Sequence, residues 1–557
     1  MKVQRKRLGD LLVEAGLITE RQLEAALLDK TVDQRIGDVL LQKELVTERQ
    51  LIEVLEFQLG IPHYRLYQYP FDTTLFSLIP KEVAKRNELI PLKKERNKLF
   101  VAMVDPMDMI AIEDLRLSTG FQIEPAIASR QDITQAITKY YDLSEEIEEI
   151  SEETASTFTG RESLEDAIRS ENSPVVRLVN QLLLGAINER ASDIHIDPQE
   201  SAILVRYRVD GQLRTERSLP KHMQNVITAR MKILANLNIT ETRAPQDGRI
   251  KKNVNSRPVD MRISTLPTVF GEKIVLRILD LTHAGNDLEL LGFEAENLRH
   301  FRSIIQRPSG IVLITGPTGS GKSSTLYAAL HDLNDTTVNI MTIEDPVEYQ
   351  LEGINQIQVN QATGMTFAKG LRAVLRGDPN IIMVGEIRDK ETVEVAIRAS
   401  LTGHLVLSTL HTNDAISTIV RLVNMGVEPF LVASAVSGIV SQRLVRKVCR
   451  DCGEPESVSP SELDLFHKRG MTIHKVMRGK GCPSCNMTGY KGRLAVQEVL
   501  VIDDEMKQLI LHKESMNTVR EYAIKKGTLF LLDDGLRKVK QGVTTTEEIL
   551  RVAMVEE

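Results

Sequence analysis

The residues best suited to chemistry follow a short apolar stretch, Ile311–Ile314. They fit the pattern G-x-x-x-x-G-K-[ST] at every position. Small residues let such a loop turn its backbone N–H groups toward phosphate oxygens. We expect Lys322 to neutralise the β and γ phosphates and the Ser323 hydroxyl to bind Mg²⁺. The predicted nucleotide-binding residues are Gly316, Pro317, Thr318, Gly319, Ser320, Gly321, Lys322, Ser323 and Ser324.

The sequence on either side of this loop indicates a strand and a helix. Ile311–Ile314 reads as a short buried strand, and residues Ser324 to Asp332 read as a helix whose positive dipole end faces the loop. A glycine-rich turn that matches by chance would not need both elements. The combination favours a nucleotide-hydrolysing site over that alternative.

Two clusters of acidic residues follow predicted strands. Glu344 and Glu348 lie in Thr342-Ile-Glu-Asp-Pro-Val-Glu, at the end of a strand predicted over Asn339–Ile343. Glu386 ends the apolar run Asn380-Ile-Ile-Met-Val-Gly-Glu, the position at which such sheets hold Mg²⁺ and the attacking water. Gly385 stands where Asp is usual, so we expect Glu386 to be the catalytic carboxylate. Glu344 is the alternative.

Two histidines and two arginines are weaker candidates. His404 and His411 flank the predicted strand Leu-Val-Leu-Ser-Thr-Leu. A single His is usually a structural residue, but a pair beside a strand of this sheet can sense the γ-phosphate. Arg249 and Arg262 lie in polar turns beside strands before the P-loop. They are either surface charges or arginines that reach the nucleotide phosphates.

All four cysteines fall into two C-x-x-C pairs, Cys449 with Cys452 and Cys482 with Cys485. This spacing is typical of two knuckles that together hold one tetrahedral Zn²⁺. A redox-active C-x-x-C would need a βαβ context that the sequence lacks. The pattern therefore predicts a closed, structural zinc site.

Chain length, net charge and the absence of long apolar runs narrow the classes of protein that fit this sequence. The chain has 557 residues, enough for three or four domains, and a formal net charge of −7. That charge argues against broad nucleic-acid affinity, so we expect no nucleic-acid partner. We find no apolar run of 18 residues and no signal-peptide pattern at the N-terminus, which predicts a cytoplasmic protein.

The N-terminus contains an internal repeat. Arg7-Leu-Gly-Asp-Leu-Leu and the following Leu-Ile-Thr-Glu-Arg-Gln-Leu recur 28 residues later, starting at Arg35. Each copy reads as two short helices, and in the first copy Thr19 and Gln22 form a predicted capping box after a left-handed Gly16. The predicted boundaries are a tandem-motif helical module at 1–60, a small α/β unit at 61–142, an acidic flexible linker at 143–172, a second N-terminal domain at 173–285, and an ATPase domain at 286–557 with a zinc subdomain at 445–490 and C-terminal helices.

Residues 7 to 58 resemble the MshE-type N-terminal module, whose tandem motifs bind cyclic di-GMP. The resemblance implies that Arg7 and Arg35 grip guanine or phosphate and that Gln58 closes the second motif. Lys30 and Glu44 depart from the family pattern. A helical docking module without a ligand therefore stays as the alternative.

The order of P-loop, acidic segment, Gly-Glu-Ile-Arg-Asp, histidine segment and tetracysteine resembles the assembly ATPases of type IV pili and type II secretion systems. The resemblance implies a multidomain α/β chain with a PAS-like α+β second domain and a RecA-like P-loop domain carrying the zinc insertion. It also implies ATP, Mg²⁺ and structural Zn²⁺, with Arg249 and Arg262 near the phosphates.

The same resemblance implies a homohexamer at the inner face of the cytoplasmic membrane, peripherally associated with a platform protein and a cytoplasmic adaptor. Its expected reaction is ATP hydrolysis coupled to filament assembly. Two alternatives stay open: a pilus retraction motor, and a cyclic di-GMP receptor with a degenerate ATPase. The tetracysteine and the long N-terminal region favour assembly over retraction.

Overall fold

The computed structural model describes residues 8–28, 36, 39–40, 43, 45–46, 50, 54, 56, 61–64, 66, 73–130, 132–134, 136–137, 141, 173–254, 257–280 and 287–553. Within these residues, contacts divide the chain into two compact units, residues 1–185 with 220–234 and residues 186–219 with 235–557. The boundaries expected from the sequence stay predictions. No helix of the described ranges has both the length and the apolar character needed to cross a bilayer.

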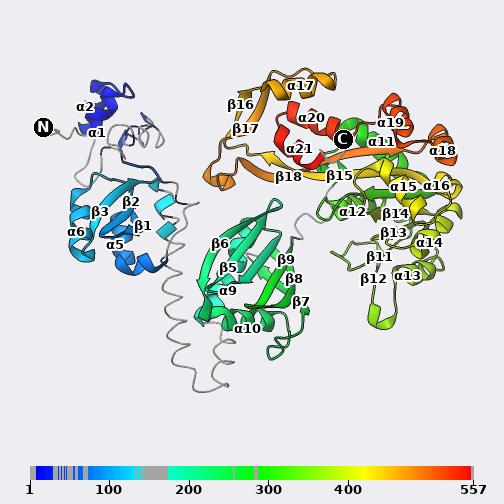
Figure 1. Ribbon diagram of the computed structural model, residues 1–557, viewed down its shortest axis with the longest axis horizontal. Helices are drawn as coiled ribbons and strands as arrows, with labels where there is room; N and C mark the ends of the chain where they lie inside the picture. Colours follow the sequence, from blue (N-terminus) through cyan, green and yellow to red (C-terminus); the bar gives the residue numbers. More distant parts are fainter. Residues whose placement is uncertain are drawn as a thin grey trace. The chain divides into compact units, whose positions relative to one another are not determined.

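The N-terminal repeat builds one small apolar core. The first copy forms α1 (Leu8–Glu14) and α2 (Glu20–Leu28) (Figure 1). The predicted capping box is confirmed. The backbone N–H of Gln22 donates to Thr19 Oγ1 (3.4 Å), and the backbone N–H of Thr19 donates to Gln22 Oε1 (2.8 Å). Gly16 has the expected left-handed φ of 69°. The core contains equivalent residues of both copies, 28 positions apart: Leu12 and Leu40, Ile18 and Val46, and Ala26 and Val54.

The next segment is a small α/β unit, as expected. Its sheet has the order β1-β2-β3, with β1 antiparallel to β2 and β2 parallel to β3. Buried residues of the strands and of α6 share one apolar cluster. The elements are a 3₁₀ helix at Thr73–Leu78, α5 (Lys81–Arg86), β1 (Leu89–Glu95), β2 (Lys98–Met103), α6 (Met109–Thr119) and β3 (Gln122–Ile127).

A sheet of order β6-β5-β4-β9-β8-β7 lies between residues 193 and 280. The pairs β4–β5, β4–β9, β8–β9 and β7–β8 are antiparallel. This sheet presents Arg249 from β7 and Arg262 from β8. The elements are α9 (Pro174–Asn188), β4 (Asp193–Pro198), β5 (Ala202–Val209), β6 (Gln212–Pro220), α10 (Gln224–Leu234), β7 (Gln246–Val254), β8 (Arg257–Thr268) and β9 (Gly271–Asp280).

The P-loop belongs to a seven-stranded sheet of order β12-β11-β13-β14-β10-β15-β18, in which β18 alone among the described strands runs antiparallel to its neighbour (Figure 1). Strand β13 and residues Ile311–Ile314 of β10 are apolar because helices cover both faces of the sheet. Ile311 and Leu313 face one helix layer, and Val312 and Ile314 face the other. The strands are β10 (Gly310–Thr315), β11 (Ile340–Glu344), β12 (Asn355–Gln358), β13 (Ile381–Val384), β14 (Leu405–Leu410), β15 (Val436–Val448) and β18 (Tyr490–Val501).

The two helix layers come from different parts of the chain. One apolar cluster contains residues of α13 to α16, α18 and α19, and the opposite one contains residues of α11 and α12. The helices are α11 (Ala295–Ile305), α12 (Lys322–Leu333), α13 (Phe367–Val374), α14 (Lys390–Leu401), α15 (Ala415–Asn424), α16 (Pro429–Ala435), α18 (Asp504–Leu511), α19 (Met516–Lys525), α20 (Leu531–Lys540) and α21 (Thr546–Ala553).

The tetracysteine segment connects β15 to β18 along the chain. It contains β16 (Gly453–Ser457), α17 (Pro460–Lys468) and β17 (Lys475–Gly479). β16 and β17 form an antiparallel pair. This insertion places both C-x-x-C pairs at the ends of the long strands, as Figure 1 shows for the elements around them.

Candidate functional site

The P-loop connects β10 to α12 at the carboxyl end of the parallel sheet. Gly316 and Gly321 have φ values of 144° and 89°, which favour glycine. A Cβ at Gly316 would lie 2.5 Å from the Gln442 carbonyl oxygen, and one at Gly321 would lie 2.7 Å from Gln442 Nε2. Pro317, Thr318, Gly319, Ser323 and Ser324 are exposed, so the mouth of the loop is open to a ligand.

Lys322 starts α12, two residues before the predicted helix start. Its Nζ atom donates hydrogen bonds to the Gly316 carbonyl (2.8 Å) and the Pro317 carbonyl (3.0 Å). Burial lowers the pKa of Lys322 to about 8, against the opposing attraction of Glu386. The ammonium group therefore lies at the loop, where phosphate oxygens can replace these carbonyls as its hydrogen-bond acceptors.

Glu344, at the end of β11, is almost fully buried, with 4% of its surface exposed. Its Oε1 accepts hydrogen bonds from Thr342 Oγ1 (2.6 Å) and Gln356 Nε2 (3.1 Å). Its Oε2 accepts one from the Tyr327 hydroxyl of α12. Burial, and then this bond to Glu344, raise the pKa of Tyr327. Both oxygens of Glu344 are engaged, so this carboxylate joins β11 to the helix that follows the P-loop.

Glu386 lies just after β13 and has a different environment. One of its oxygens pairs with Arg388 (2.6 Å), and the other lies 3.5 Å from His411 Nε2. Strands β13, β14 and β10 are neighbours in the sheet, and Lys322, Glu386 and His411 follow their carboxyl ends. The structure thus brings these three predicted residues together.

His404 is not part of this group. It precedes β14, and Leu405 pairs with Gly310 at the start of β10, so His404 lies at the opposite edge of the sheet from the P-loop. A six-residue strand separates the two edges by about 20 Å. The Nδ1 atom of His404 lies 2.9 Å from the Ala399 carbonyl at the end of α14. The prediction that both histidines sense the γ-phosphate is therefore wrong for His404, and His411 is the histidine that lies at the candidate site.

The two predicted arginines lie within adjacent strands, Arg249 in β7 and Arg262 in β8, so their predicted placement in polar turns is wrong. Arg249 Nε donates to both carboxylate oxygens of Asp260, at 2.7 and 2.8 Å. Arg262 Nη2 donates to the Val347 carbonyl (2.9 Å) and pairs with Glu348 (3.0 Å). Arg262 therefore contacts the acidic segment that follows β11, and a cavity of about 950 Å³ is lined by Arg249, Asp260, Val347 and Glu348 among others.

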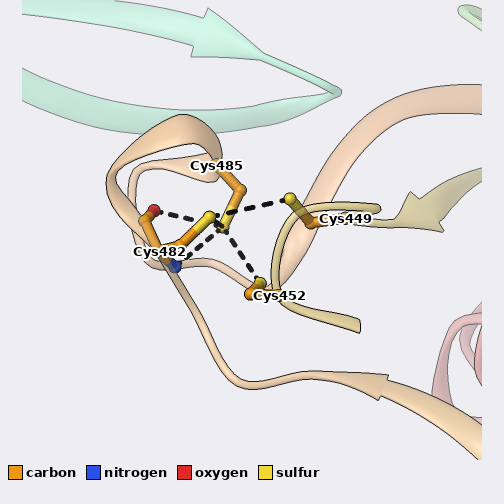
Figure 2. A group of neighbouring side chains, drawn as sticks. All are labelled: Cys449, Cys452, Cys482 and Cys485. Atoms are coloured by element: carbon orange, nitrogen blue, oxygen red, sulfur yellow. Dashed lines mark hydrogen bonds between the residues drawn. The ribbon is translucent and has the colours of Figure 1, made fainter. Parts of the chain in front are cut away.

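The four cysteines meet in one cluster, as Figure 2 shows. Their sulfur atoms lie within 4.8 Å of one another, with Sγ–Sγ distances of 3.8 Å (Cys449–Cys482), 3.8 Å (Cys452–Cys485) and 3.7 Å (Cys482–Cys485). A disulfide would need about 2.05 Å. Sulfurs at the corners of a tetrahedron with Zn–S bonds of about 2.3 Å are about 3.8 Å apart, so the cluster fits a Zn²⁺ ion.

Sequence reasoning overlooked a pair of polar residues in β15, Gln442 and Arg443. Both are buried, with exposed fractions of 2% and 7%. They occur in Gly-Ile-Val-Ser-Gln-Arg-Leu-Val, an apolar strand in which buried polar residues are unusual. Two polar residues in an otherwise apolar strand are the sequence feature that could have identified them. Both residues contact the P-loop region.

The fold and the site define a P-loop nucleotide hydrolase with a mostly parallel sheet. The family model described as "Type II/IV secretion system protein" matches residues 169–551. The chain belongs to this family, and relatives named as ATPases of type IV pilus assembly and type II secretion identify it as an ATPase of that group.

Relatives extend over most of the chain. A protein of Myxococcus xanthus named "Type IV pilus assembly ATPase PilB" is 42% identical over 98% of each chain. "Type II secretion system ATPase E" of Vibrio cholerae is 42% identical over 85% of this chain and 96% of its own. The X-ray structure of the Legionella pneumophila ATPase DotB shares the fold, with a TM-score of 0.52 and 22% identity over 68% of this chain and 96% of that chain.

A second family model, the MshEN domain, matches residues 59–147. This range is the small α/β unit, directly after the repeats that carried the resemblance in the sequence. The match does not include Arg7, Arg35 or Gln58, and all three residues lie outside the part of the chain that the structure describes, as do Lys30 and Glu44. Their predicted contacts with cyclic di-GMP stay predictions.

Proposed function

We propose that this ATPase powers the extension of a type IV pilus or a type II secretion pseudopilus. The observation that carries the proposal is the relative from Myxococcus xanthus, named as a pilus assembly ATPase, which aligns over 98% of both chains. Such an alignment covers the N-terminal region as well as the motor. The tetracysteine cluster supports the same choice.

In this proposal Lys322 and the loop N–H groups bind the phosphates, and Ser323 binds Mg²⁺. Glu386 orients and deprotonates the attacking water, because it is the carboxylate that lies with Lys322 and His411. Glu344 holds β11 against α12 through its buried hydrogen bonds. Arg249 and Arg262 reach the nucleotide when the two sheets close on it, which couples hydrolysis to domain movement.

We further propose that the chain works as a homohexamer, attached peripherally to the cytoplasmic face of the inner membrane through a platform protein and an adaptor. One Zn²⁺ per chain in the tetracysteine cluster supports folding of the insertion. Cyclic di-GMP is a candidate ligand of the N-terminal module, in line with the MshEN match. Isothermal titration of cyclic di-GMP into the full chain and its Arg7→Ala and Arg35→Ala variants tests this last point.

Extension and retraction differ in what loss of the motor does to a cell. A strain that carries only Lys322→Ala in place of the wild-type gene should lack surface filaments and release no phosphate in an ATPase assay of the purified chain. Accumulated, non-retracting filaments would instead identify a retraction motor. Normal filaments together with a negligible wild-type ATPase rate would favour a cyclic di-GMP receptor with a degenerate site.

A further inference from the structure

Strand β15 continues past the end of its neighbour β10 and runs alongside the P-loop. The last residue of β10, Thr315, pairs with Ser441 of β15. The next residues of β15, Gln442 and Arg443, therefore lie beside the first residues of the loop. Because successive side chains of a strand point to opposite faces, these two residues reach different partners.

Gln442 joins two parts of the phosphate-binding element. Its Nε2 donates to the Ser320 carbonyl (2.8 Å), and its Oε1 accepts from Thr325 Oγ1 in the first turn of α12 (2.8 Å). Both contacts are buried. The fit is close, since a Cβ at Gly321 would lie 2.7 Å from Gln442 Nε2.

The bond to Ser320 matters for phosphate binding. A loop that binds phosphate must direct N–H groups at the anion and turn its carbonyl oxygens away, since these would repel it. The Gln442 amide gives the Ser320 carbonyl a partner on the side of β15. It thereby favours the loop conformation in which the neighbouring N–H groups face the ligand.

The side chain of Arg443 points to the opposite face of the sheet from that of Gln442. Its Nη1 donates to the Gln442 carbonyl (3.1 Å), and its Nη2 donates to the Asn413 carbonyl (2.6 Å). Asn413 lies two residues after His411. Through these contacts β15 links the P-loop to the segment that holds His411 beside Glu386.

We propose that Gln442 is a positioning residue for ATP binding: its side-chain amide fixes the Ser320 carbonyl and the first turn of α12 so that the P-loop is preorganised for phosphate. It does not touch the nucleotide. Loss of this contact should therefore weaken nucleotide binding and raise KM, while the chemical step of bound ATP changes less.

The test measures three quantities: the Kd of a fluorescent ATP analogue in the presence of Mg²⁺, kcat and KM for ATP, and the Tm without nucleotide. In the full chain, Gln442→Leu should raise Kd and KM by about tenfold and alter kcat by less than about threefold. Gln497→Leu is the matched control, because Gln497 is fully buried on β18 directly opposite Gln442. Its Kd should stay within about twofold of wild type.

Two further variants separate positioning from general packing. Gln442→Met has nearly the same shape and carries no charge, but it removes the amide donor to the Ser320 carbonyl and the acceptor for Thr325. It should keep a Tm near that of the wild type and lose affinity about as strongly as Gln442→Leu. In a double-mutant cycle, Thr325→Val should add little to the affinity loss of Gln442→Leu.

Several results would overturn the proposal. One is a Gln442→Met variant that binds nucleotide like the wild type, whether or not Gln442→Leu folds. Others are equal affinity losses in Gln442→Leu and Gln497→Leu, or fully additive effects with Thr325→Val. Each would assign Gln442 to the packing of the sheet alone.

Discussion

The Nε2 atom of His411 lies 3.5 Å from a carboxylate oxygen of Glu386. The two residues follow neighbouring strands, β14 and β13, at the edge of the sheet where Lys322 begins α12. His404 lies at the other edge of β14, beside the Ala399 carbonyl. The two histidines of one short segment therefore lie at opposite ends of β14.

His411→Ala should lower kcat for ATP by about tenfold, because one interaction that orients Glu386 is lost. His404→Ala should leave kcat within about threefold of wild type and lower the Tm instead, because its contact closes the end of α14. Steady-state phosphate release and differential scanning calorimetry of both variants check this. A larger kcat loss in His404→Ala would contradict the assignment.

Glu386→Gln should retain ATP and Mg²⁺ binding and lose hydrolysis by roughly 10²–10⁴-fold, the usual contribution of a general base. Glu344→Gln should lose less hydrolysis and show a lower Tm, because both oxygens of Glu344 serve buried hydrogen bonds. Single-turnover hydrolysis with bound ATP separates the two. If Glu344→Gln were the slower variant, Glu344 would be the base.

Purified chain should contain one equivalent of Zn²⁺, measured by metal analysis with the thiol count as a check. Cys449→Ser should lose the metal and lower the Tm of the motor, because the cluster connects the strands on both sides of the insertion. Ser484→Ala, next to Cys485 but without a metal-binding group, is the control. A structural zinc site would be ruled out if the wild type contained no metal and four titratable thiols and if Cys449→Ser left the Tm unchanged.

Glu548 of α21 is a buried carboxylate that pairs with Arg446 and Arg551. Burial alone would raise its pKa, but hydrogen bonds from Arg446 and Arg551 outweigh burial and lower the pKa to about 2. A carboxylate with a lowered pKa stabilises the fold above its unfolded-state value near 4.5, and the effect is lost as pH falls toward 2.

Glu548→Gln should therefore destabilise the motor by about 3 kcal/mol at pH 7, and the difference from wild type should shrink between pH 4.5 and 2.5. Denaturant unfolding at a series of pH values measures it. Glu547→Gln, at a side chain that is 58% exposed, is the control and should change stability by less than about 1 kcal/mol. A pH-independent difference would contradict the ion-pair account.

Local features of the fold followed the sequence closely. The Thr19–Gln22 capping box and the left-handed Gly16, both expected from the sequence, are present. These features depend on residues within a few positions of one another. The family of the N-terminal unit was also predicted, but the MshEN match falls on residues 59–147 and not on the repeats.

The sequence by itself identified the P-loop, the acidic segments and the four cysteines, because short motifs carry their own geometry in their spacing. Only the tertiary structure separated Glu386 from Glu344 and His411 from His404. It also brought Gln442 of β15 under Ser320, over 120 residues away. Strand order and register decide which side chains meet at one edge of a sheet, and these arise from packing across the chain.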